Sequence, residues 1–461
     1  MAGTRDVRLS TSLGSIGCAL GSPSEQASTR CVAIRRALGA ARLGLLAGVV
    51  TIPIIAFNPS DGFDGFYGVK AQAVLLLGAL MAAWWACALL TRTITLTRLS
   101  PILVVGLGLT GWLTLSTLVS VDPSGAVWGS ALRHDGLLVW FAGLVVMATA
   151  MTMSDERSWR TVGDAAALTC VGVSAYAVLQ HFGLDFSGLS TSLTYARSSG
   201  TFHNPVVLGG YLTLMMPILV IRAVRSDGRA AALLWTAGVG VTLAATYFTF
   251  SRAAWIGSLG GLLLLVGLLL WTRSSRYRRL IGVIAVAALL AIAVSLVPRG
   301  DRVVVEPHSL AKDAASAVSI SDARNAGRLA TWAIALAIIR DRPWFGTGPD
   351  QMGAVFESYR TPQFDEGEGP AVVADKAHSE PLNLAVTLGI PGALLCFLLL
   401  CVVGREPARQ SLRRALGPES AAVMCGLAGY LAASLVSITV PGVHTIFFLL
   451  LGMLARPREG R

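Results

Sequence analysis

Twelve apolar runs, each about as long as one membrane crossing, limit what this chain can fold into. A helix needs about 20 apolar residues to cross a hydrocarbon core of roughly 30 Å. With 54% hydrophobic and 14% charged residues, the composition also differs from that of soluble domains. We therefore predict an all-α polytopic membrane protein of about twelve transmembrane helices. The runs lie near residues 42–58, 71–91, 100–119, 136–153, 162–180, 205–221, 230–250, 253–271, 280–297, 383–403, 418–437 and 441–455.

The distribution of basic residues predicts the orientation. Cytoplasmic loops carry an excess of Lys and Arg. The amino-terminal tail, every second loop and the carboxyl tail together hold 24 of the 37 Lys and Arg residues. Nine more lie in one long loop, where the rule has little weight. We expect both termini in the cytoplasm, and we attribute the net charge of +11 to topology and anionic lipid, without nucleic acid.

The runs also divide the chain into segments. We predict a disordered cytoplasmic tail over 1–40, helices 1 to 9 over 41–297, an extracytoplasmic loop over 298–380, helices 10 to 12 over 381–456 and a cytoplasmic tail over 457–461. The long loop contains a helix-like stretch from Arg328 to Ile339. Its apolar face is expected to lie on the membrane surface and consists of Leu329, Trp332, Leu336 and Ile339.

The cores of the runs contain no Asp, Glu, Lys or Arg. Ion-coupled carriers usually place such residues near the middle of the membrane, so a proton- or sodium-driven transporter is disfavoured. A transporter of a lipid-linked glycan or a neutral solute stays open, and so does a non-catalytic scaffold. Because the Cys and His residues show no metal-ligand spacing, we expect no metal and no cofactor.

The first candidate site is the segment from Trp128 to Gly136, which precedes the fourth run. Its Trp and Leu side chains suit an interfacial position, and Arg133 could bind a phosphate there. The alternative is an interfacial anchor in which Arg133 pairs with Asp135 or with a lipid headgroup. The sequence does not decide between these interpretations.

The second candidate site is the segment from Arg197 to Pro205, which precedes the sixth run. A cation, hydroxyl groups and glycine backbone beside a helix amino terminus suit an anion. His203 and Asn204 belong to this segment, and Asn204 is also expected to cap the helix with Pro205 in its first turn.

The third candidate site is Ser251-Arg252, which joins two long apolar runs with almost no polar loop between them. A cation at the membrane boundary should reach a headgroup or bind an anionic ligand. The fourth is His378, directly before the tenth run. An imidazole titrates near neutrality and can accept a hydroxyl proton, although a lone interfacial His is more often structural.

The order of these segments along the chain resembles that in the O-antigen ligase and Wzy-type polymerase superfamily, over residues 120–400. One departure is Ser379, because such proteins often have Asn directly after the histidine. The resemblance rests on RSSGTFHNP from Arg197, SRAAW from Ser251, RLATW from Arg328, PWFGTGP from Pro343, AHSEPL from Ala377 and LGIPG from Leu388.

The resemblance implies a glycosyltransferase C-like membrane fold in the inner membrane of a bacterial cell. It implies metal-independent transfer of a glycan from a polyprenyl diphosphate carrier to a glycan, lipid or protein acceptor on the extracytoplasmic face. His378 would be the base, kept neutral by neighbouring arginines. Ligation and polymerisation share this chemistry and stay open. The resemblance further implies diphosphate binding by Arg197, Arg252 and Arg328, and donor or acceptor contacts by Arg133, His203, Asn204 and Ser251.

Overall fold

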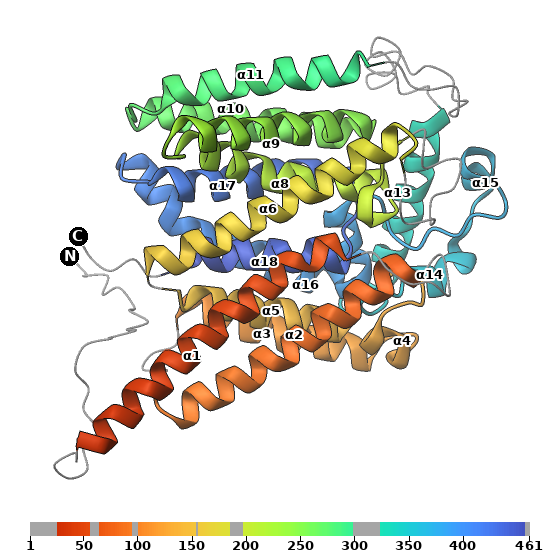
Figure 1. Cartoon of the computed structure of the whole chain (residues 1–461). Helices are drawn as coiled ribbons and strands as arrows, with labels where there is room; N and C mark the ends of the chain where they lie inside the picture. The colour runs from red at the N-terminus through yellow and green to blue at the C-terminus, as the bar shows by residue number, and fades with distance from the viewer. Residues whose placement is uncertain are drawn as a thin grey trace.

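The structure is a computed structural model that describes residues 25–55, 64–94, 100–153, 155–184, 197–297 and 323–456. Within these ranges every regular element is a helix (Figure 1). The predicted tails at 1–24 and 457–461, and the first part of the long loop at 298–322, lie outside the described residues. Residues 25–40, which we expected in a disordered tail, belong to the first helix.

Over the residues that the structure describes, each of the twelve apolar runs overlaps a helix. Nine helices in the described part of the chain are long and apolar enough to cross a membrane, while α5 and α18 are apolar but have 15 residues each. The fold is therefore that of a polytopic membrane protein, and the count of twelve crossings stays a prediction. The helices are α1 (Glu25–Thr51), α2 (Asp64–Leu90), α3 (Pro101–Leu118), α5 (Leu137–Met151), α6 (Glu156–His181), α8 (Pro205–Val224), α9 (Arg229–Phe248), α10 (Arg252–Trp271), α11 (Tyr277–Ser295), α16 (Glu380–Leu412), α17 (Pro418–Ser434) and α18 (Pro441–Ala455).

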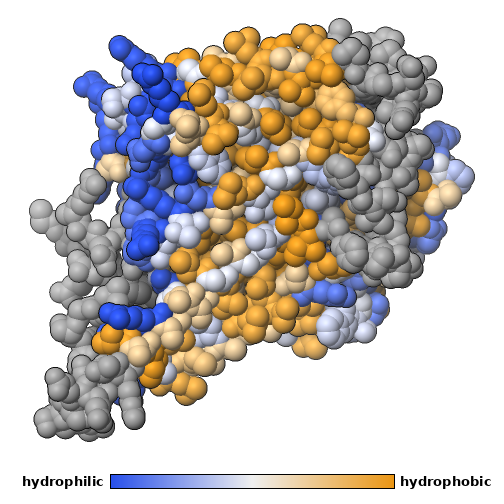
Figure 2. Space-filling view, viewed as in Figure 1, coloured by the Kyte–Doolittle hydropathy of each residue, from blue (hydrophilic) through white to orange (hydrophobic). Residues whose placement is uncertain are grey.

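α8 is the central helix of the bundle. In its apolar window 89% of the residues are buried, because α6, α9, α10 and α17 all pack against it. The outer helices instead present apolar side chains to the surroundings, as in α11, where only 17% of the window is buried. Figure 2 shows the resulting broad hydrophobic band, with hydrophilic side chains gathered at the end where α6 begins and α8 ends. Such a band suits contact with lipid tails.

A lobe lies at the opposite end of the bundle (Figure 1) and consists of α13 (Ala323–Asp341), α14 (Met352–Val355), η3 (Phe356–Tyr359) and α15 (Pro362–Glu368). The short helix α4 (Pro123–Trp128) lies at the same end and packs against α3 and α5. The face of α13 that packs in this lobe carries Ile334 and Ile338, which are buried with Phe356 and Phe364, and it differs from the face that we expect to lie on the membrane surface. Both faces of α13 are apolar, and the face carrying Leu329 and Leu336 stays 48% and 57% exposed.

α16 is broken at Gly389, where φ is 70°. The turn that follows α13 fills the break, because the Ile390 amide donates a hydrogen bond to the Pro343 carbonyl at 2.8 Å. A Cβ atom at Gly389 would lie 1.9 Å from the Trp344 carbonyl oxygen. Only glycine combines this backbone conformation with so close an approach. The segment from Pro343 and the segment from Leu388, both noted in the sequence, thus pack against each other and connect the lobe to α16.

Candidate functional site

Four helices, α5, α8, α10 and α16, begin at the end of the bundle that carries the lobe, and the candidate residues precede or start them. Asn204 caps α8, since its Oδ1 accepts a hydrogen bond from the Val206 amide at 2.9 Å. Ser251 caps α10 through the Ala254 amide at 3.4 Å. Both caps satisfy amide groups that would otherwise lack partners. The capping role predicted for Asn204 is confirmed.

Arg133 forms a two-pronged ion pair with Asp375, the second contact being Nη2 to Oδ1 at 3.2 Å. Its guanidinium also lies 5.4 Å from the centre of the Tyr67 ring. The alternative in which Arg133 pairs with Asp135 is wrong, because Asp135 points to other partners. Arg133 therefore ties the segment before α5 to the segment before α16.

His378 lies three residues beyond Asp375 and is largely buried, with a left-handed backbone at φ 49°. Burial lowers the pKa of the imidazole, and the charges of Arg328 and Arg133 lower it further, against an opposite effect of Asp375. The ring is thus neutral at physiological pH and able to accept a proton. The arginines that act on it are Arg328 and Arg133.

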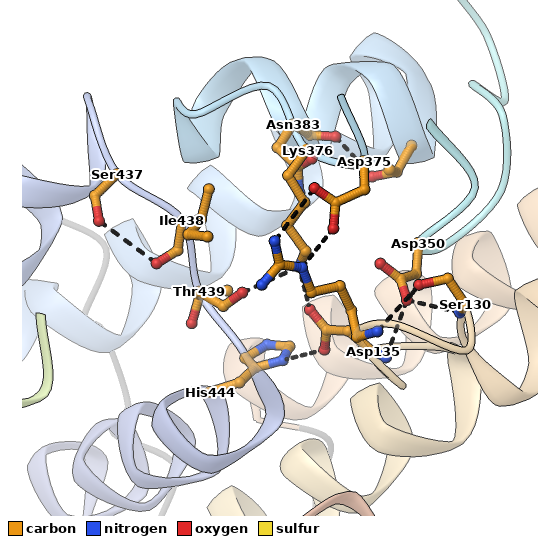
Figure 3. A network of polar contacts seen from close by, with 12 residues as sticks. Ser130, Asp135, Asp350, Asp375, Lys376, Asn383, Ser437, Ile438, Thr439 and His444 are labelled. Atoms are coloured by element: carbon orange, nitrogen blue, oxygen red, sulfur yellow. Dashed lines mark hydrogen bonds and ion pairs between the residues drawn. The ribbon is translucent and has the colours of Figure 1, made fainter. Parts of the chain in front are cut away.

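A buried polar network lies beside this segment (Figure 3). The Lys376 ammonium lies 2.8 Å from Asp135 Oδ2 and donates to the Thr439 carbonyl at 3.1 Å. His444 Nδ1 lies 3.3 Å from the other oxygen of Asp135. Asp350 accepts from the Ser130 amide and hydroxyl, each at 2.8 Å, and from the Asp135 amide at 3.2 Å. The network joins α5, α18, the lobe and the segment before α16.

The charges in this network stabilise one another. Burial by itself raises the pKa of Asp135, but the Lys376 ammonium and the His444 ring bring that pKa down to about 2. Burial by itself lowers the pKa of Lys376, and the carboxylates of Asp135 and Asp350 raise it above its ordinary value. Asp135 and Lys376 therefore form a charged pair at neutral pH.

Arg197 is directed to the segment that starts α10. Its guanidinium donates to the carbonyl oxygens of Thr249 at 3.0 Å and Phe250 at 3.3 Å. These carbonyls come directly before Ser251 and Arg252, so the second and third candidate sites meet in space. The sequence placed them on the same side but gave no distance between them.

Several other groups of the Arg197 to Pro205 segment form hydrogen bonds within the protein. The amides of Ser199 and Gly200 both donate to Gln180 Oε1, at 3.0 and 2.9 Å. The Thr201 hydroxyl donates to the Pro53 carbonyl. These groups hold the segment against α6 and the residues that follow α1, while the buried hydroxyls of Ser198 and Ser199 have no hydrogen-bond partner among the described residues.

The start of α2 contacts both Arg133 and the segment from Arg197 to Pro205. Phe66 stacks on the His203 ring with centroids 4.5 Å apart, while the neighbouring Tyr67 lies under Arg133. Lys70 is 0% exposed and donates to the carbonyls of Thr201 at 2.7 Å and Phe66 at 3.2 Å. Sequence reasoning placed Lys70 just outside a span, but α2 begins earlier and includes it.

Sequence reasoning missed the network of Asp135, Asp350, Lys376 and His444. The network could have been suspected from the sequence, because these charged residues lie at the ends of apolar runs or in the long loop, on the predicted extracytoplasmic side. Opposite charges at one membrane boundary are expected to pair. Among the described residues, no group of three or more His, Cys, Asp or Glu side chains is arranged to hold a metal ion.

Comparison with known proteins adds a family match. A family model described as O-antigen ligase matches residues 210–397. The match runs from α8 through the break in α16 and includes Arg252, Arg328 and His378, while Arg133 and Arg197 precede it. Among curated proteins, no match to the chain is found.

Proposed function

We propose that this membrane protein, whose residues 210–397 match a family model described as O-antigen ligase, transfers a glycan from a polyprenyl diphosphate carrier to an acceptor hydroxyl. The reaction takes place at the end of the bundle that holds His378, which we assign to the extracytoplasmic face of a bacterial inner membrane. Both termini then lie in the cytoplasm, as the distribution of basic residues predicts. The family itself comprises ligases and polymerases of glycans.

The observation that carries this proposal is the environment of His378. Burial and the charges of Arg328 and Arg133 lower the pKa of its ring. A neutral imidazole beside fixed cations suits a reaction in which a base takes a proton while negative charge gathers nearby.

In the proposed step, the acceptor hydroxyl gives its proton to His378 while its oxygen attacks the anomeric carbon. The new C–O bond forms on the face opposite the diphosphate, and the bond to the diphosphate breaks with its electron pair leaving on the diphosphate oxygen. Arg252, Arg197 and Arg328 stabilise the growing negative charge. The configuration at the anomeric carbon inverts, and the imidazolium later returns its proton to water.

The direct test is transfer by the full chain in lipid vesicles, supplied with a polyprenyl diphosphate-linked glycan and an acceptor. A single added glycan identifies a ligase, and a ladder of products identifies a polymerase. Movement of the donor across the vesicle membrane without any product would instead support a transporter. Product size and donor location are read in the same samples, so the three outcomes are separated.

A further inference from the structure

A second charged cavity lies at the end of the bundle away from His378. It has a volume of about 370 Å³ and is formed by the start of α6, the end of α8, the residue before α11 and the start of α17. Figure 2 shows hydrophilic side chains gathered at this end. Four arginines line it together with three carboxylates; the arginines are Arg160, Arg222, Arg225 and Arg276.

Two of these arginines are held in place by carboxylates. Arg222 Nε lies 2.5 Å from Asp164 Oδ1, and its guanidinium lies 4.8 Å from the centre of the Trp235 ring. Arg225 contacts Glu419, and the two side chains are 19% and 16% exposed. Fixed guanidinium groups are suited to bind phosphate because they present several N–H donors in one plane.

The cavity lining thus holds one more arginine than carboxylate, and its other two arginines are not paired with a carboxylate of the lining. Arg160 pairs with Glu156 at 3.3 Å, and Arg276 has no ion pair with any residue that the structure describes. Burial lowers the pKa of Arg225, and the charges of Arg160, Arg276 and Arg222 lower it further. Cations crowded in this way repel one another, and an anion between them would relieve the repulsion.

We propose that this cavity binds a phosphate-bearing anion, either the headgroup of an anionic lipid or a free phosphate compound. The cavity is large enough for a glycerophosphate group. It lies on the side that the basic residues assign to the cytoplasm, where anionic lipids attract juxtamembrane arginines. This site is separate from the proposed transfer site, because the two lie at opposite ends of α8.

The test compares two double variants of the full chain with the same change in charge. Arg160→Gln with Arg276→Gln removes the two exposed arginines that line the cavity. Arg273→Gln with Arg278→Gln, in the same region, removes two exposed arginines that do not line the cavity. Because Arg160 and Arg276 are also exposed, both double variants are expected to fold.

Binding is measured as the rise in thermal unfolding temperature with two probes, inorganic phosphate in detergent and phosphatidylglycerol in phosphatidylcholine nanodiscs. We expect the cavity variant to bind about tenfold more weakly and the control variant to bind as the wild type does. Stabilisation by phosphatidylglycerol alone identifies a lipid headgroup, and stabilisation by inorganic phosphate identifies a free phosphate compound. Equal loss in both variants, or no binding by the wild type, would overturn the proposal.

Discussion

The Lys376 ammonium lies 2.8 Å from the Asp135 carboxylate, and the two side chains are only 3% and 5% exposed. Arg133, two residues before Asp135, forms a second ion pair with Asp375, one residue before Lys376. The two pairs bind the segment before α5 to the segment before α16. His378 follows directly after this double connection, so its position depends on charges that lie far away in the sequence.

Breaking the buried pair should destabilise the protein strongly. Lys376→Met leaves the Asp135 carboxylate buried without its cation, which typically costs about 3–5 kcal/mol of unfolding free energy. The double variant Asp135→Leu with Lys376→Met should recover part of this loss, because no unpaired charge stays buried. Thermal unfolding in detergent measures both.

The matched control is Arg340→Gln in α13. It breaks an ion pair with Asp341 whose side chains are 85% and 47% exposed, and it should cost less than about 1 kcal/mol. If Lys376→Met were as mild as this control, the pair would not hold the two segments together.

The break in α16 should tolerate no side chain at Gly389. In Gly389→Ala the new methyl group would meet the Trp344 carbonyl at 1.9 Å, on a backbone with φ of 70°. We expect a loss of several kcal/mol, or failure to reach the membrane in folded form. Gly404→Ala in the same helix has open space around its Cβ and should change stability by no more than about 1 kcal/mol. Equal losses of stability in Gly389→Ala and Gly404→Ala would rule out the close contact between Gly389 and the Trp344 carbonyl.

The pH dependence of transfer should report the lowered pKa of His378. A base acts in its neutral form, so transfer falls as the pH drops through a pKa that lies below the ordinary 6.5, and it is flat near pH 7. Arg328→Gln removes one of the charges that lower this pKa, so the fall should begin at a higher pH. Arg340→Gln, in the same helix, should leave the midpoint unchanged. An unchanged midpoint in Arg328→Gln would contradict the proposed environment of His378.

The apolar runs were sufficient to predict the helices, because the need to satisfy backbone groups in lipid leaves few other folds. The cap of α8 was also predictable, since Asn204 and its partner amides are local in sequence. The packed face of α13 was not predictable, because both faces are apolar and Phe356 and Phe364 decide which one is covered.

Contacts between distant segments were also out of reach of the sequence. Asp135 and Lys376 are 241 positions apart, and Arg133 and Asp375 are 242 apart. The sequence offered Asp135 as the nearest carboxylate for Arg133, but the fold brings Asp375 there instead. The resemblance pointed to His378, while the buried ion pairs that position it became visible only in the structure.

The central claim is that His378 acts as the base in glycan transfer, and one comparison tests it most directly. His378→Asn and His134→Asn both replace a histidine with a left-handed backbone by a residue that tolerates this conformation. With equal amounts of folded protein in vesicles, transfer from a polyprenyl diphosphate donor should fall by about 10²–10⁴-fold in His378→Asn and stay near wild type in His134→Asn. Wild-type transfer by His378→Asn would contradict the claim.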